Sequence, residues 1–240
     1  MTVLVVPWRD RGDPARKRNL QVVCDHLYRA DLGPVFMSSD GRNGDAPFNR
    51  SAAYNRAVAA HPGERVFVFN EADLLVPAEQ LRAAVLMAGH RRGLVVPFEE
   101  YRYLSEPVTA AVWRGAAGDP FTLPPLRVMP PRRAVGACNV VSALSLDAVG
   151  CWDEAFEGWG WDDRAMAHGF TVATGCGTRF VPGPAVHLYH PPAWQAGTGF
   201  AGGGQLPVDA QARTRANRDR YRKYLTATKP RQIQKLTRGG

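Results

Sequence analysis

The chain has 240 residues, and its 45% hydrophobic and 10% aromatic side chains exclude an intrinsically disordered protein. This length suits one α/β domain with a single core. The net charge is +8, but residues 211–240 carry ten basic side chains and one acid, so residues 1–210 are almost neutral. No apolar run reaches the roughly 18 residues of a membrane span, and the first residues, MTVLVVPWRD, lack the features of a signal peptide.

The first hundred residues alternate between short apolar strands and amphipathic helices. After a strand at 2–8, Asp13 followed by Pro14 is typical of a helix start. Further strands are predicted at 34–39, 65–70 and 93–98, and further helices at 49–61 and 77–90. This alternation predicts an open, mostly parallel sheet with helices on both faces.

From about residue 100 the alternation weakens. Pro-rich and Gly-rich residues 116–135 predict a loop, 136–144 a strand and 161–170 a short helix. Residues 191–208 are again rich in Gly and Pro and predict a long mobile loop that closes over a ligand. A final helix at about 209–228 carries much of the basic charge. We find no repeat and no linker, so we expect one domain at 1–208 followed by a basic helix and tail at 209–240.

The four cysteines are scattered along the chain and form no CxxC pair. Their positions are Cys24, Cys138, Cys151 and Cys176. This distribution is typical of reduced thiols and not of a disulfide framework or a zinc site, so we expect a cytoplasmic protein.

Two acids, Glu71 and Asp73, directly follow the apolar strand 65–70. Ligands of open α/β sheets bind at the carboxyl ends of strands. One carboxylate can therefore face a sugar hydroxyl and the other a divalent ion, for which oxygen ligands suit Mg²⁺ or Mn²⁺. Acids that stabilise the start of the next helix explain the pair equally well.

Two histidines, His187 and His190, lie in VHLYHPP at the end of an extended segment. Each alone is typical of a structural histidine, but beside an acidic pair an imidazole can be a further ligand for Mn²⁺. The stretch GTGFAGG at 197–203 has the letters of a dinucleotide-binding loop. It follows no strand–helix turn, so we exclude that function.

The segment EGWGWDD, residues 157–163, sets two tryptophans against two aspartates. A core helix has no use for adjacent acids, and a solvated loop has no use for two indoles. The pattern therefore indicates a surface that stacks on a ligand and a carboxylate that acts on it. A tryptophan-rich corner of the core beside two solvated acids is the alternative.

Taken in chain order, these segments resemble the glycosyltransferases. PWRDR at 7–11 resembles the PFRNR nucleotide-binding loop of the β-1,4-galactosyltransferases, and FNRSAAYN at 48–55 resembles their FNRAxLLN segment. EAD at 71–73 stands in place of their DxD metal motif, and GWGWDD at 158–163 resembles their GWGxED acceptor motif. AVGCWDEAF at 148–156 is similar to the GGFDExF of many family 2 glycosyltransferases. The resemblance covers about residues 3–190 and implies a single-domain GT-A fold, a Rossmann-like open sheet flanked by helices.

The resemblance also implies roles for individual residues. Asp163 would be the catalytic base, and Asp162 the acid that orients the acceptor. Mn²⁺ (or Mg²⁺) would be bound by Asp73 and His187, with His190 as the substitute. A nucleotide-sugar donor, with UDP as the expected nucleotide, would contact Pro7, Trp8, Arg9, Arg11, Phe48, Arg50 and Glu71. The acceptor would contact Trp159, Gly160, Trp161 and Asp162.

Three departures from the family pattern affect these roles. Glu71 replaces the first Asp of DxD, and its longer side chain would shift the donor contacts. Asp162 replaces a Glu and Trp161 a Gly, so the acceptor of the family cannot be carried over.

Three functions follow from the sequence. The first is a metal-dependent, inverting transferase that moves a sugar to a hydroxyl of a protein, saccharide or lipid. The second has as its acceptor a hydroxylated base such as 5-hydroxymethylcytosine in DNA, as in small bacteriophage enzymes that modify DNA. The basic tail favours this acceptor, although an arginine-rich solvated helix end would look the same. The third is a non-catalytic module that binds nucleotides or carbohydrates.

Overall fold

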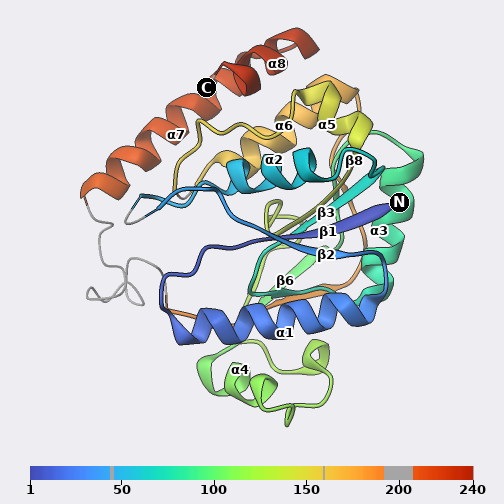
Figure 1. Cartoon of the computed structure of the whole chain (residues 1–240), viewed down its shortest axis with the longest axis vertical. Coiled ribbons are helices and arrows are strands. Elements are labelled where there is room, and N and C mark those ends of the chain that lie inside the picture. The colour runs from blue at the N-terminus through green and yellow to red at the C-terminus, as the bar shows by residue number, and fades with distance from the viewer. Residues whose placement is uncertain (44–45, 159, 192–207, 240) are drawn as a thin grey trace.

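A six-stranded sheet runs through the centre of the molecule, with helices on both of its faces (Figure 1). The computed structural model describes residues 1–43, 46–158, 160–191 and 208–239. In spatial order the strands are β2 (Val35–Ser38), β1 (Thr2–Pro7), β3 (Val66–Asn70), β8 (Cys138–Ser142), β5 (Val95–Val96) and β9 (Arg179–Phe180). Strand β8 is antiparallel to β3 and β5, and the other neighbours are parallel. The predicted open, mostly parallel sheet is confirmed.

The central strands are apolar throughout because both faces of the sheet are covered. In β1, Leu4 and Val6 join the hydrophobic core on one face, and Val3 and Val5 join the core on the other, as alternating side chains must. The first face is covered by α1 (Pro14–Ala30) and α3 (Ala78–His90). The second is covered by α2 (Arg50–Ala60), α5 (Ala143–Val149) and α6 (Asp162–Thr174).

A second, four-stranded sheet brings β10 (Pro184–His187), late in the chain, next to β4 (Leu74–Leu75), which follows β3 directly. Its order is β4, β10, β6 (Glu100–Tyr103) and β7 (Arg127–Met129). Strand β10 is antiparallel to β4, and His187 pairs with Leu74. This register places the histidine segment next to the acids that follow β3.

The region after residue 100 contains more regular structure than predicted. Helix α4 (Glu106–Trp113) was not predicted, and the expected loop at 116–135 contains a 3₁₀ turn, η1 (Pro120–Thr122), and β7. The strand predicted at 136–144 ends at Ser142, because the Ser142 hydroxyl accepts the Ser145 N–H and begins α5. Of the predicted mobile loop, residues 192–207 lie outside the described residues.

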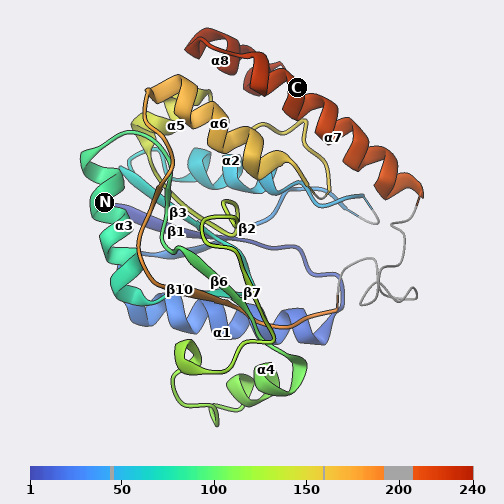
Figure 2. The same cartoon turned by 180° about the vertical axis from the view of Figure 1, so that it is seen from behind.

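The basic C-terminal segment forms two helices, α7 (Val208–Thr226) and α8 (Pro230–Arg238), that run across α6 (Figure 2). Tyr224 and Ile233 are completely buried against α6. The buried Asp153 accepts hydrogen bonds from Arg220 at 2.6 and 2.8 Å and from the Tyr224 hydroxyl at 2.8 Å. The aspartate of the WDEAF segment therefore anchors α7.

Within the described ranges, no helix is both long and apolar enough to cross a membrane. All four cysteines are free thiols.

Candidate active site

The loop after β1 is held against residues 40–43 and 46–48 by arginine side chains. Arg9 donates to the carbonyl oxygens of Arg42 at 3.2 Å and Ala46 at 2.5 Å, and it lies 3.5 Å from the buried Asp40 carboxylate. Its guanidinium also lies over the Phe48 ring, 5.6 Å from the centroid. Arg11 donates to the same Ala46 carbonyl at 2.8 Å. The structure thus brings the predicted donor-binding residues of the two segments together.

The side chain of Arg50 is the centre of an acidic cluster. Asn49 caps α2 and places Arg50 in its first turn. The guanidinium binds Glu71 at 2.6 Å, Asp162 at 2.5 Å and also Asp163. Residues that are distant in the sequence, from the EAD and WDD segments, therefore share one cation.

The acids after β3 are positioned by the backbone around them. The Glu71 N–H donates to the Ala137 carbonyl at 3.0 Å. The buried Asn70 amide donates to the carbonyls of Glu71 at 2.8 Å and Leu74 at 3.0 Å, which closes the turn. Glu71 then faces Arg50, and Asp73 faces β10.

Asp73, His187 and His190 form a three-residue cluster that could hold a metal ion. One ligand atom from each lies within 4.8 Å of the other two. Asp73 is 2.8 Å from Nε2 of His190 and 3.7 Å from Nε2 of His187. Asp73 Oδ1 and His187 Nδ1 are buried without a hydrogen-bond partner among the described residues. A carboxylate and two imidazoles with unsatisfied buried atoms fit a divalent transition metal.

Burial and pairing set the charges in this cluster. Burial would raise the pKa of Asp73, but the neighbouring imidazoles, His187 foremost, hold it below its ordinary value. Burial lowers the pKa of His187 to about 4. For His190 burial lowers the pKa, but the hydrogen bond to Asp73 and the charge of that carboxylate together outweigh burial and raise it. An ionised carboxylate and a neutral His187 are the forms that bind metals.

The predicted acceptor segment turns sharply before α6. Gly158 and Gly160 have φ angles of 69° and 101°, which glycine adopts without strain, and Trp161 has a φ of 73°. The Trp161 ring stacks on Tyr221 of α7, with centroids 5.4 Å apart, and Arg164 lies over it at 5.6 Å. The indole therefore packs partly against α7. Trp159 lies outside the described residues.

Asp162 and Asp163 occupy the first turn of α6, where the helix dipole favours negative charge. Asp162 is 14% exposed and Asp163 37% exposed, so Asp163 is the more accessible carboxylate. Burial raises the pKa of Asp163 to about 6, although Arg50 opposes the shift. Burial raises the pKa of Glu71 as well. Because burial raises its pKa to about 6 in this cluster of three acids, the carboxylate of Asp163 can bind a proton near neutral pH.

Sequence reasoning missed Gly136, which lies directly under the Asp163 carboxyl. A Cβ at position 136 would lie 1.9 Å from Asp163 Cγ. The Gly136 carbonyl also accepts a hydrogen bond from Arg50 at 3.2 Å. A glycine two residues before the buried strand β8, in GACNVV, is the available signal, because a glycine there can mark a close approach of another group to the backbone.

We expect Gly136→Ala to reduce turnover by about 10²-fold, because a displacement of about 1 Å of a reacting group has that effect. Gly136 does not have a positive φ, so the backbone accepts alanine and Asp163 has to move. Gly63→Ala is the matched control, since a Cβ at Gly63 meets nothing within 4 Å. Steady-state kinetics of both variants test this, and equal rates would show that Gly136 does not position Asp163.

The structure resembles known glycosyltransferases, although no protein-family model and no curated protein sequence matches the chain. It is similar to the catalytic domain of Drosophila β1,4-galactosyltransferase 7 in complex with xylobiose, with a TM-score of 0.50 and 14% identity over 96% of this chain and 82% of that one. It is also similar to GalNAc-T7 with UDP, GalNAc and Mn²⁺, with a TM-score of 0.51 and 13% identity. That match covers 96% of this chain and 51% of GalNAc-T7, so the chain spans about half of its length. The chain thus has the GT-A glycosyltransferase fold, as predicted.

Proposed function

We propose that the chain is a metal-dependent glycosyltransferase that moves a sugar from a UDP-sugar to an acceptor hydroxyl with inversion. One observation carries the proposal. Asp73 of the cluster with His187 and His190 lies two residues after Glu71, which is joined through Arg50 to the acids of α6, on the GT-A fold. This arrangement supports a transfer site in which the donor half and the acceptor half would be adjacent.

The residues have distinct roles in this reaction. Asp73, His187 and His190 would hold Mn²⁺ (or Mg²⁺), which when bound neutralises charge on the departing diphosphate. The loops at 7–11 and 48–50 would contact the nucleotide, which we infer to be UDP because one structural neighbour, GalNAc-T7, was solved with UDP. Glu71 would face the donor ribose or sugar.

Asp163 acts on the acceptor. Its carboxylate accepts the proton of the acceptor hydroxyl as that oxygen forms a bond to the anomeric carbon. The bond from the anomeric carbon to the phosphate oxygen breaks on the opposite side, and the configuration inverts. Asp162 orients the acceptor, while Arg50 holds both aspartates in place.

A panel of UDP-sugars and GDP-sugars, assayed with Mn²⁺ for binding and for slow hydrolysis, tests the proposal. We expect one UDP-sugar to bind and to release UDP. Binding without any turnover would favour the non-catalytic module, and no binding of any nucleotide sugar would contradict both.

The pH dependence of the rate follows from Asp163. Its pKa is raised to about 6, and only the ionised form accepts a proton. We therefore expect kcat to rise as the pH increases through about 6 and to level off above about 7. A kcat that is constant between about pH 5 and pH 7 would contradict the assignment of Asp163 as the base.

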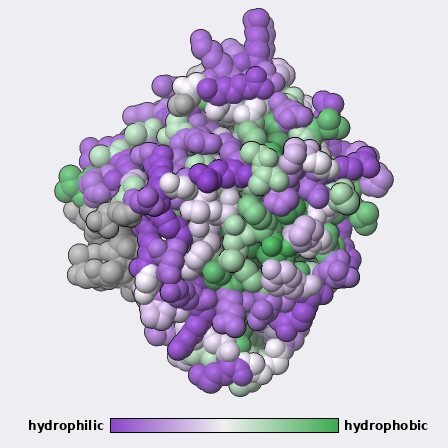
Figure 3. Space-filling view, in the orientation of Figure 1, coloured by the Kyte–Doolittle hydropathy of each residue, from purple (hydrophilic) through white to green (hydrophobic). Residues whose placement is uncertain are grey.

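The exposed basic residues of α7 and α8 favour DNA as a second candidate acceptor. Arg231, Lys235 and Arg238 recur at the spacing of one helix face, and all three are exposed. Figure 3 shows the hydrophilic surface at the top of the molecule, where Figure 1 places α8. Like charges on one face suit the phosphates of a polyanion.

If DNA is the acceptor, three to five phosphate contacts give a slope of log K against log salt of about −3 to −4. Replacing Arg231, Lys235 and Arg238 with Gln should reduce the size of this slope by about 2 to 3 and leave donor hydrolysis unchanged. Gln at the exposed Arg29, Arg91 and Arg92, on the other face of the sheet, is the control. DNA binding that does not depend on salt or on α8 would move the acceptor to the protein, saccharide or lipid class.

A further inference from the structure

The peptide of Tyr189, between the two candidate metal-binding histidines, is held by two buried side chains. Strand β10 ends at His187, so Leu188 and Tyr189 lie outside the strand pairing of the sheet. The Tyr189 N–H donates to the hydroxyl of Thr109 at 2.9 Å, and its carbonyl accepts from the Asn19 amide at 3.0 Å. Asn19 and Thr109 are both fully buried. The N–H and the carbonyl of Tyr189, between the two histidines, are therefore both fixed.

Asn19 stands on the core-facing side of α1. It precedes Val23 and Leu27 at intervals of four residues, and both are buried in the hydrophobic core. An amide in such a position is unfavourable unless both of its ends are paired. Asn19 Oδ1 accepts from the Trp113 indole N–H at 2.8 Å, while its amino group serves Tyr189. Asn19 therefore links α1, α4 and the histidine segment.

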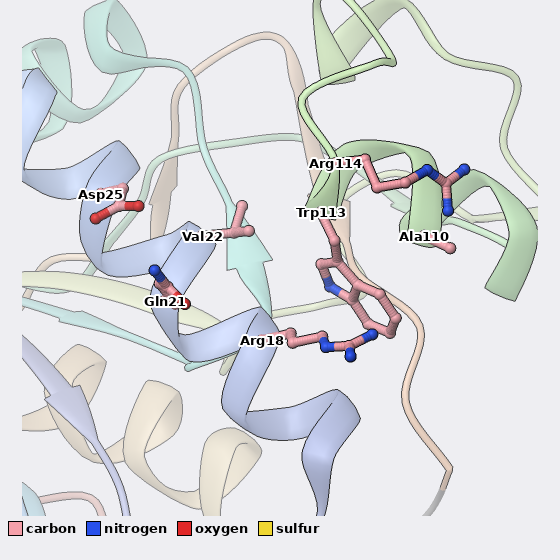
Figure 4. A pocket seen from close by; sticks show the side chains of 7 residues that line it. All are labelled: Arg18, Gln21, Val22, Asp25, Ala110, Trp113 and Arg114. Carbon is pink, nitrogen blue, oxygen red and sulfur yellow. The ribbon is translucent and has the colours of Figure 1, made fainter.

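Helix α4 supplies the other two members of this link, Thr109 and Trp113. Figure 4 shows Trp113 directed from α4 toward α1, beside Arg18, whose guanidinium lies 5.4 Å from the indole centroid. A hollow of about 470 Å³ remains between the two helices next to this contact. Arg18 therefore packs on the Trp113 ring, while the indole N–H donates to Asn19.

The same segment is also fixed from the side of Asp73. The Leu188 N–H donates to the Asp73 carbonyl at 2.8 Å, and the Leu188 side chain is fully buried. The Leu104 N–H donates to the His187 carbonyl at 3.0 Å. Together, these backbone hydrogen bonds fix the path of the chain after β10. That path determines where the His187 and His190 imidazoles lie.

We propose that Asn19 and Thr109 are positioning residues that hold His187 and His190 in the geometry that binds a divalent cation. The inference rests on the proposed metal site. Groups that orient metal ligands without touching the metal typically change metal affinity by about 10–100-fold. Helix α4, which carries Thr109 and Trp113, would thereby support the metal site.

The test measures Mn²⁺ affinity by titration of the donor-free protein, with free Mn²⁺ followed by electron paramagnetic resonance. Thr109→Val removes the hydroxyl at almost constant volume and should weaken Mn²⁺ binding by about 10–100-fold. Thr109→Ser keeps the hydroxyl and should restore affinity. Thr237→Val is the matched control, because Thr237 of α8 is also buried and its hydroxyl donates to the Val149 carbonyl at the end of α5.

A second variant keeps the proposal testable if Thr109→Val does not fold. Trp113→Phe removes the indole donor to Asn19 and leaves an aromatic ring in place, and it should also weaken Mn²⁺ binding. Folded variants that bind Mn²⁺ as the wild type does would overturn the inference. Failure of the wild-type protein to bind Mn²⁺ would instead overturn the proposed metal site.

Discussion

Replacement of Asp163 by Asn is expected to lower turnover by about 10²–10⁴-fold, the usual contribution of a general base. Asn has the shape of Asp and keeps an oxygen for Arg50, so the acidic cluster can remain assembled. What it lacks is an oxygen that accepts a proton. Since Asp163 is proposed to act on the acceptor and not to contact the donor, the affinity for the donor nucleotide should stay near that of the wild type.

Measurement of kcat for transfer, together with the Kd for UDP, separates these two effects. Asp162→Asn is the matched control, because Asp162 binds the same guanidinium from the preceding position. We expect this control to raise the KM for the acceptor more than it lowers kcat. Near-normal turnover in Asp163→Asn would assign the base to another residue, and Asp162 would be the first to examine.

Replacement of Asp73 by Ala is expected to abolish Mn²⁺ binding and to lower transfer by about 10³-fold or more. A bound metal contributes several kcal/mol of transition-state stabilisation, and each 1.36 kcal/mol is about tenfold in rate. Asp73 is the one carboxylate in the cluster and contacts both imidazoles. Its removal leaves only two partly buried histidines in the cluster.

Chelation gives the same test without a mutation, since EDTA should stop transfer and added Mn²⁺ should restore it. His187→Ala should also weaken the metal site, whereas His90→Ala should not, because His90 is exposed at the end of α3. Full activity in EDTA would contradict the metal assignment.

The sequence predicts the fold well where local patterns determine the structure. The alternation in residues 2–90 identifies the central strands and helices, because apolar periodicity follows burial. Helix α4 was missed because it lies between short elements and has a single fully buried residue, Thr109. The α8 helix was missed because its apolar positions are few, although Pro230 marks its start.

The sequence identified residues of the candidate site, but it could not show how they are arranged in space. Asp73 and both histidines were predicted as ligands, but only the antiparallel register of β4 and β10 shows that all three can meet. Arg50 was predicted to bind the donor, and the structure shows its guanidinium among three acids. No local pattern encodes a contact across more than 100 residues.

The residues that support the site were the least visible in the sequence. Gly136 is one of many glycines, and its significance depends on the position of Asp163. Asn19 interrupts the apolar face of α1, which is a usable signal, since a polar residue at a core position needs a partner. Which partner it finds depends on the tertiary structure.

The most direct test of the account is the coupling between UDP and Mn²⁺ in the wild-type protein, measured by calorimetry. If Asp73, His187 and His190 hold a cation that also contacts the diphosphate, each ligand must raise the affinity of the other by the same factor. We predict that UDP binds about 5–150-fold more tightly with Mn²⁺ than with EDTA, the usual range for coupled ligands. Equal UDP affinity in Mn²⁺ and in EDTA would contradict the central claim that this cluster is the metal site of a nucleotide-sugar transferase.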